Sequence, residues 1–163
     1  MTQDKRQHGF TLVEMLVYIA VLMVTAVGSI GLLLSLDNLF AKYRAEQKIF
    51  RSATTALERI VYDIRSADSV SASSYLYPGT LSLSIDGDIF TYATSSDALH
   101  VSENGTDIGP LTETGVKVTD FAVYSYSDVT DFARVRITLS SSYGGITVTE
   151  TFNAGAVLRG SYE

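Results

Sequence analysis

The hydrophobic pattern of the chain changes near residue 36. From Phe10 to Leu36 almost every position is apolar, proline is absent, and Glu14 is the only charged side chain. This run is longer than the roughly 20 residues that a helix needs to cross a bilayer. A carboxylate at the centre of a membrane costs about 2.5–3.5 kcal/mol, so Glu14 is a candidate functional residue.

The apolar periodicity continues beyond residue 36 as one face of a helix. Apolar residues recur at intervals of three and four, with a gap near Gln47. They are Leu36, Leu39, Phe40, Tyr43, Phe50, Ala53, Leu57, Ile60, Val61, Ile64 and Ala67. Because no proline interrupts residues 11–67, the pattern predicts one long helix that becomes amphipathic at residue 37. A heptad alignment leaves one seam half polar, which favours packing against a sheet over a two-stranded coiled coil.

Short strands are predicted after residues 66–74, which are rich in Ser, Ala and Asp and end the helix. The alternating runs are 80–85, 89–92, 98–101, 115–126, 133–139, 146–152 and 156–158. Turns are expected at Asp86-Gly87-Asp88, Asn104-Gly105 and Tyr143-Gly144-Gly145. In the longest run, the alternation places Val116, Val118, Ala122, Tyr124 and Tyr126 on one face. The expected fold class is therefore α+β, with a long helix packed on an antiparallel meander.

Charge and cysteine content exclude several kinds of site. The net charge is −6, and residues 1–9 contribute +1, which leaves −7 for residues 10–163. Direct binding of nucleic acid is not expected, because contacts to phosphates need clustered Lys and Arg. The chain has no cysteine, so disulfides, thiolate metal sites and cysteine nucleophiles are excluded.

No catalytic arrangement is recognisable, so we expect neither enzyme activity nor a cofactor. His8 precedes the apolar run, and His100 lies in a short strand without an identifiable partner. A nucleophile elbow, a Gly-rich phosphate loop and a helical His pair for zinc are all missing from the sequence. Asp86 and Asp88 are too few for Ca²⁺, which takes 6–8 oxygens, so a hairpin turn is favoured and no metal site is expected.

The start of the apolar run carries a specific motif. The short polar segment 4–9 contains Lys5 and Arg6, and Gly9-Phe10-Thr11-Leu12-Val13-Glu14 follows. This junction resembles the N-terminus of type IV pilins and pseudopilins, the subunits of type IV pili, type II secretion pseudopili and DNA-uptake filaments. The resemblance implies a pilin-like fold, cleavage between Gly9 and Phe10, and N-methylation of Phe10. It also implies that Glu14 acts in assembly by pairing with the Phe10 amine of a neighbouring subunit.

The resemblance implies four parts and a defined topology. Residues 1–9 are a leader peptide, 10–36 a transmembrane and assembly helix, 37–67 an amphipathic helix, and 68–163 an antiparallel β-sheet domain. The leader should stay cytoplasmic because positive flanks do, which places the C-terminal domain outside the cytoplasmic membrane. The expected final location is a cell-surface or periplasmic filament. The implied partners are other pilin or pseudopilin subunits, the prepilin peptidase, an inner-membrane assembly platform and, before assembly, membrane lipid.

Gly28 and Gly31 are weak points of the predicted helix, because glycine lowers helix stability by up to about 1 kcal/mol. Members of the family commonly have proline where this chain has Gly31, and their helix can loosen there in the filament. This chain departs from that pattern, and glycine keeps its N–H group. Bending of the helix and close approach of a neighbouring helix both remain open as the role of these residues.

Looser similarities concern the subtype. Residues 57–67 resemble the late helix of minor pilins and J-type minor pseudopilins, and residues 116–121 and 152–159 resemble their later strands. These similarities favour a minor subunit. The alternative is an uncleaved, single-pass membrane-anchored extracytoplasmic binding domain. A secreted domain is disfavoured, because the apolar run exceeds the 7–15 residues typical of a signal-peptide core and lacks a good cleavage site.

Overall fold

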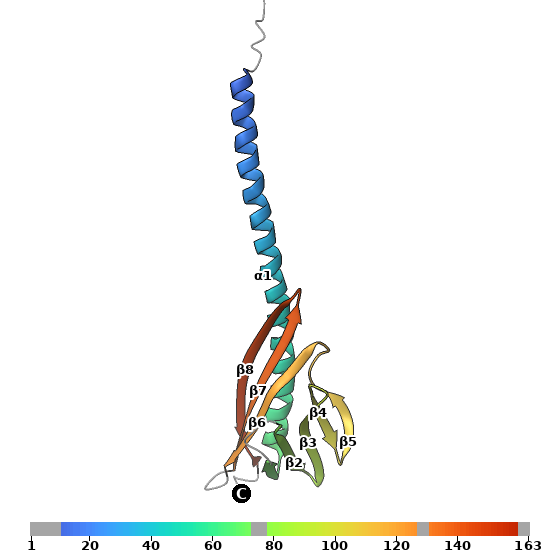
Figure 1. The fold of residues 1–163 in the computed structure, drawn as a ribbon. Coiled ribbons are helices and arrows are strands. Elements are labelled where there is room, and N and C mark those ends of the chain that lie inside the picture. The colour runs from blue at the N-terminus through green and yellow to red at the C-terminus, as the bar shows by residue number, and fades with distance from the viewer. Residues whose placement is uncertain (1–10, 73–77, 127–130, 160–163) are drawn as a thin grey trace, which may run out of the picture. The chain divides into compact units, whose positions relative to one another are not determined.

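The long helix α1 runs without interruption from Leu12 to Ser66 (Figure 1). The structure is a computed structural model that describes residues 11–72, 78–126 and 131–159. By its contacts the chain divides into two units, Met1–Phe40 and Ala41–Glu163, and α1 contributes residues to both. The prediction of one continuous helix over residues 11–67 is confirmed.

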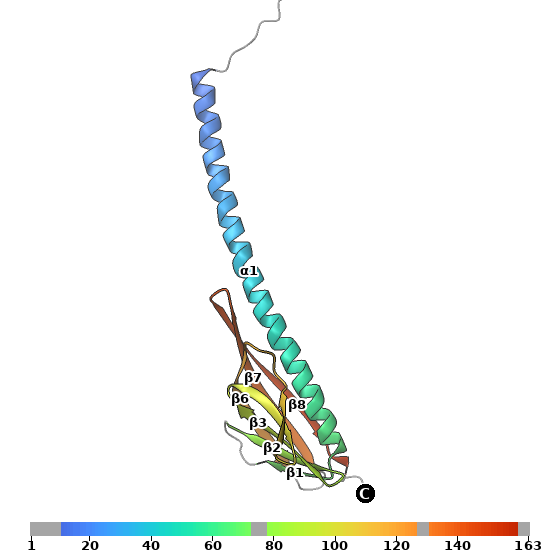
Figure 2. The same cartoon turned by 90° about the vertical axis from the view of Figure 1, so that its right-hand side faces the viewer.

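In the described residues, eight strands follow α1 and form two antiparallel sheets. Figure 2 shows them along one side of the C-terminal part of α1. The five-stranded sheet has the order β1-β2-β3-β4-β5, from β1 (Ser69–Ala72), β2 (Thr80–Ile85), β3 (Asp88–Ser95), β4 (Ala98–Glu103) and β5 (Thr106–Pro110). The three-stranded sheet has the order β6-β7-β8, from β6 (Val116–Tyr126), β7 (Phe132–Tyr143) and β8 (Ile146–Val157).

The α+β class is confirmed, but the expected single meander is wrong because two sheets form. The backbone N–H of Leu111 donates to the carbonyl oxygen of Leu99 at 2.7 Å, and beyond this hydrogen bond the chain leaves the five-stranded sheet. Gly115 then starts the second sheet with a φ of 89°, a backbone conformation that glycine adopts without strain. A further strand, β1, pairs with β2 in the segment that was expected only to end the helix.

The predicted hairpin turns are present at both Asp86-Gly87 and Asn104-Gly105. All four residues have positive φ, between 49° and 94°, which is the geometry of a type I′ turn. Asp88 begins β3, and its side chain accepts a hydrogen bond from Asn104 at 2.9 Å. The preference for a hairpin over a calcium loop at Asp86 and Asp88 therefore agrees with the described geometry.

The buried stripe of α1 differs from the predicted one before residue 53. It is made largely of small residues: Ala41, Ala45, Ile49, Ser52, Ala53, Ala56, Ile60, Asp63 and Ile64. The predicted core positions Tyr43 and Phe50 are 56% and 64% exposed. Alanine side chains let the strands approach the helix closely, so the large aromatic residues lie on the flank instead.

The strand β6 changes its inward face at a β-bulge. Its register with β7 shifts between Val118 and Asp120. Because one extra residue reverses the alternation, Phe121 and Val123 join Val116 and Val118 in the core. The predicted face that combined Val116 with Ala122, Tyr124 and Tyr126 is therefore wrong beyond the bulge.

One close contact between the two sheets is at Gly79, directly before β2. Its backbone N–H donates to the carbonyl oxygen of Phe121 at 2.9 Å. A Cβ atom added to Gly79 would lie 2.5 Å from the same oxygen, closer than van der Waals contact allows. Only glycine therefore fits this junction without a backbone shift.

A buried polar cluster connects α1 to the five-stranded sheet. The Asp63 side chain on α1 accepts hydrogen bonds from the Tyr92 hydroxyl on β3 and from Arg59 Nε, the latter at 3.0 Å. Tyr92 is fully buried and Asp63 is 2% exposed. Burial, together with the hydrogen bond to Asp63, raises the pKa of Tyr92 well above its ordinary value of 10.0.

Candidate processing and assembly site

The helix α1 begins with a capping arrangement of Thr11 and Glu14. The Thr11 Oγ1 atom accepts a hydrogen bond from the backbone N–H of Glu14 at 3.3 Å. The Thr11 carbonyl oxygen accepts from the N–H of Met15 at 3.2 Å, so Thr11 is the N-cap residue. The Thr-x-x-Glu spacing is that of a capping box. Glu14 thus lies in the first turn, where the helix dipole favours a negative charge.

The Glu14 side chain remains available for a partner. It is exposed, and it makes no hydrogen bond or ion pair with any residue that the structure describes. Because the Thr11 hydroxyl already caps the helix, the carboxylate can bind a cation from outside the chain. Gly9 and Phe10, the predicted cleavage junction and methylation site, lie outside the described residues and stay predictions.

The apolar run that follows is exposed along its whole length. The large apolar side chains from Leu12 to Leu36 are 49–82% exposed. Full burial of one such side chain stabilises by about 1.5–3 kcal/mol, so leaving this run in water costs on the order of tens of kcal/mol. That cost exceeds the stability of a typical domain, about 5–15 kcal/mol. The run therefore needs lipid or other apolar helices around it, and it is long and apolar enough to cross a membrane.

Two hydroxyl groups within the run, those of Thr25 and Ser29, bond to the helix itself. Thr25 Oγ1 donates to the carbonyl oxygens of Val21 and Leu22, at 3.1 and 2.9 Å. Ser29 Oγ donates to the Thr25 carbonyl oxygen at 2.8 Å. These two polar side chains are satisfied without water, as an apolar environment requires.

Gly28 and Gly31 lie inside α1 without interrupting it. A Cβ atom added at either position meets nothing within 4 Å. The structure of the single chain therefore gives neither residue a packing role. Both expectations, a bend and close approach of another helix, stay predictions.

The comparison with protein families bears directly on this segment. A family model described as the prokaryotic N-terminal methylation motif matches residues 4–35, which include Glu14 and nearly all of the apolar run. This chain is a type IV pilin-like protein. Searches of curated proteins and of solved structures gave no match.

The family match bears on the processing, assembly and membrane anchoring of the chain. The motif implies that this pilin-like protein is a substrate of a prepilin peptidase and assembles with other pilin subunits. The motif and the apolar helix also fit anchoring in a membrane. The match does not extend to residues 57–67 or 116–121, so the minor subtype stays a prediction.

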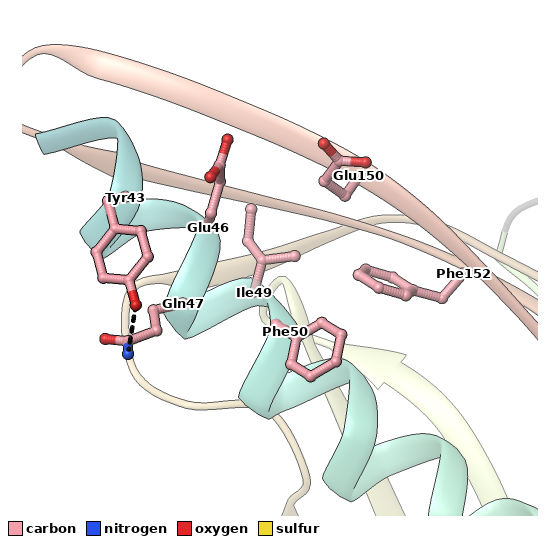
Figure 3. A pocket seen from close by; sticks show the side chains of 7 residues that line it. All are labelled: Tyr43, Glu46, Gln47, Ile49, Phe50, Glu150 and Phe152. Carbon is pink, nitrogen blue, oxygen red and sulfur yellow. Dashed lines mark hydrogen bonds between the residues drawn. The ribbon is translucent and has the colours of Figure 1, made fainter. Parts of the chain in front are cut away.

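A groove in the second unit of this pilin-like protein was not predicted from the sequence. It lies between α1 and β8 and has a volume of about 440 Å³ (Figure 3). Its floor includes Phe50 and Phe152. Their ring centroids are 6.5 Å apart, and the rings are edge to face, an arrangement that aromatic pairs prefer. The two residues are far apart in the sequence, so no local pattern indicates that they meet.

The structure gives His100 a partner that could not be identified from the sequence. The Nδ1 atom of His100 lies 3.0 Å from Oδ2 and 3.2 Å from Oδ1 of Asp107 on the neighbouring strand β5, in a diagonal contact, because Asp107 is paired with Ser102 in the strand register. The hairpin was predicted from Asn104-Gly105, but the side-chain contact between His100 and Asp107 was not. Within the described residues, no group of three or more His, Cys, Asp or Glu side chains could hold a metal ion.

Proposed function

We propose that the chain is a non-catalytic structural subunit of a type IV pilus, a type II secretion pseudopilus or a DNA-uptake filament. One observation carries the proposal: the methylation motif matches residues 4–35, and the apolar part of this segment is an exposed helix in which Glu14 is the only charged residue up to Leu36. Cleavage between Gly9 and Phe10 removes the leader. The new Phe10 amine is then methylated and begins the mature chain.

Assembly is proposed to depend on the charge of Glu14. Outside water, an isolated carboxylate and an isolated amine are each costly, and their attraction is strong. Pairing of Glu14 with the Phe10 amine of a neighbouring subunit removes both costs and fixes the axial position of the incoming chain. The exposed and unpaired state of Glu14 in the single chain supports this role.

The proposed topology follows from the charges that flank the apolar run. Lys5 and Arg6 precede it and should remain cytoplasmic, because positively charged flanks are retained on that side. The unit Ala41–Glu163 then lies outside the cytoplasmic membrane. After assembly with the help of an inner-membrane platform, the subunit belongs to a cell-surface or periplasmic filament.

A minor role is the finer part of the proposal. It rests on the similarity of residues 57–67 to the late helix of minor pilins and J-type minor pseudopilins. A minor subunit at or near the tip would help to initiate assembly. Deletion of the subunit should then lower the number of filaments, whereas an unchanged number would contradict initiation.

Mass spectrometry of the N-terminal peptide from the native host tests the main proposal. A mature chain that begins at methylated Phe10 is the expected result. An intact leader in cells with an active prepilin peptidase would instead support the single-pass anchored binding domain. A start near residue 30 would indicate ordinary secretion and overturn the role of Glu14.

A variant at Glu14 tests the assembly step. Glu14→Ala should leave the protein in the membrane but outside the filament, because the carboxylate is needed for pairing and not for insertion. The measurement is the amount of the chain in sheared or purified filaments relative to the membrane fraction. Efficient incorporation of the variant would overturn this step.

A further inference from the structure

The groove between α1 and β8 has an aromatic floor and acidic walls. Glu46 from α1 and Glu150 from β8 stand on its two sides, above Phe50 and Phe152 (Figure 3). Glu46 forms an exposed ion pair with Lys42 at 3.6 Å, a kind of contact that stabilises little. Glu150 is exposed and forms no salt bridge with another described residue. The groove therefore offers negative charge to a partner.

The opposite flank of α1 is basic over the same length of helix. Arg44, Lys48 and Arg51 follow at intervals of four and three, which places them on one side. Arg51 comes five residues after Glu46, and at about 100° per residue it lies roughly 140° around the helix axis from it. Lys48 and Arg51 form no salt bridge with a described residue. Arg44 stacks over the Tyr143 ring at 5.2 Å, which holds its charge on this flank.

We propose that the acidic groove of one copy binds the basic flank of α1 of a second copy. The rings of Phe50 and Phe152 can receive the aliphatic part and the cation of an arginine, while Glu46 and Glu150 pair with its charge. The argument for a second copy is charge complementarity: this chain carries both surfaces, at the same level of one helix. Two different surfaces of the subunit meet in this contact, so it can repeat along an open helical assembly.

This inference rests on the proposed filament function and adds the contact that orders neighbouring β-sheet units. It also bears on stoichiometry. The contact requires at least two copies next to each other, so a subunit present once per filament would have to leave the groove empty or fill it with a different pilin subunit.

Disulfide cross-linking between full-length copies tests the contact, since the chain has no native cysteine. Two differently tagged copies, one with Glu150→Cys and one with Arg51→Cys, are produced together in the native host. A cross-linked species that carries both tags, at about twice the monomer mass, is expected. Thr149→Cys in place of Glu150→Cys is the matched control, because Thr149 is exposed on the opposite face of β8. Yields no higher than this control would overturn the inference.

The same samples separate the two proposals. N-terminal mass spectrometry reports processing at Phe10, and cross-linking reports the groove. Processed chains without the cross-link overturn the groove contact and leave the filament function standing. Unprocessed chains with the cross-link support the groove contact and contradict the filament function.

Charge reversal provides a second readout in the folded chain. The reporter pair Gln47→Cys and Thr55→Cys leaves every charge of the contact in place, because Thr55 is exposed and lies two helical turns after Lys48 on the same flank. Glu150→Lys should lower the cross-linking yield about fivefold, the upper range for an exposed ion pair, and Arg51→Glu in the other copy should restore it. Glu103→Lys on β4 is the control and should change nothing. An unchanged yield with Glu150→Lys would contradict the proposed contact.

Discussion

The hydroxyl of Tyr92 donates a hydrogen bond to the buried carboxylate of Asp63, although the two residues are 29 positions apart. This bond joins the C-terminal part of α1 to the centre of the five-stranded sheet. A buried carboxylate is costly unless hydrogen bonds replace its water. Tyr92 and Arg59 are the two side chains that supply such bonds to Asp63 in the described residues.

Tyr92→Phe should destabilise the sheet domain by about 1.5–3 kcal/mol, because it removes a hydrogen bond to a charged group and leaves buried oxygen unsatisfied. The measurement is denaturant unfolding of the full chain in detergent, monitored through the near-UV circular dichroism signal of its tyrosines. Tyr62→Phe is a matched control on the exposed side of α1. Equal unfolding midpoints for the two variants would contradict this role of Tyr92.

The contribution of Tyr92 should depend on pH at the alkaline end. Its folded pKa is raised above the unfolded value near 10, so its stabilising effect is complete below pH 10. Above pH 10 the unfolded chain loses this proton while the folded chain keeps it, so stability falls by up to about 1.4 kcal/mol per pH unit. The difference in unfolding free energy between the wild type and Tyr92→Phe should therefore shrink above pH 10. Parallel curves up to pH 11 would exclude this linkage.

Two substitutions should separate the capping role from the charge role at the start of α1. Thr11→Ala removes the N-cap and should weaken the first turn by about 1 kcal/mol, which faster amide exchange at Glu14 and Met15 would report. Glu14→Gln keeps the capping-box spacing and should retain normal exchange, but it removes the charge and should abolish incorporation into filaments. If Glu14→Gln assembles normally, hydrogen bonding rather than charge is what assembly requires.

Gly79→Ala should destabilise the junction of the two sheets by about 1–3 kcal/mol, the usual range for overpacking. The added Cβ would lie 2.5 Å from the Phe121 carbonyl oxygen, and a backbone shift is the only relief. Gly31→Ala is the control, because its Cβ meets nothing within 4 Å. Unfolding in denaturant measures both variants, and a stability of Gly79→Ala equal to that of the control would refute the close contact.

Features with local signals could be predicted from the sequence. The absence of proline and the regular apolar spacing indicated α1, and Asp-Gly and Asn-Gly indicated two hairpins. The motif from Gly9 to Glu14 indicated the family, since its chemistry depends on adjacent residues. In each case the residues that determine the feature are neighbours in the chain.

Features that depend on distant partners could not be predicted. The large residues Tyr43 and Phe50 dominate the periodic pattern of the sequence. The sheets pack instead on a stripe of α1 that contains Ala45 and Ala53, so the buried face of the helix differs from the predicted one. The bulge in β6 changed the inward face by a single extra residue, which alternation alone does not reveal. The contact of Phe50 with Phe152 and the hydrogen bond between Tyr92 and Asp63 exist only after the chain has folded.

The hydroxyl bonds of Thr25 and Ser29 have a consequence for the movement of the helix between environments. Both side chains donate to carbonyl oxygens of their own helix, so neither needs a lipid headgroup, a water molecule or a neighbouring subunit. In the proposed assembly, extraction of the helix from a bilayer into a packed bundle therefore breaks no hydrogen bond at these positions. At these two positions, contacts with lipid are replaced by apolar contacts with other helices. The free-energy difference between the membrane and the proposed filament is therefore small there.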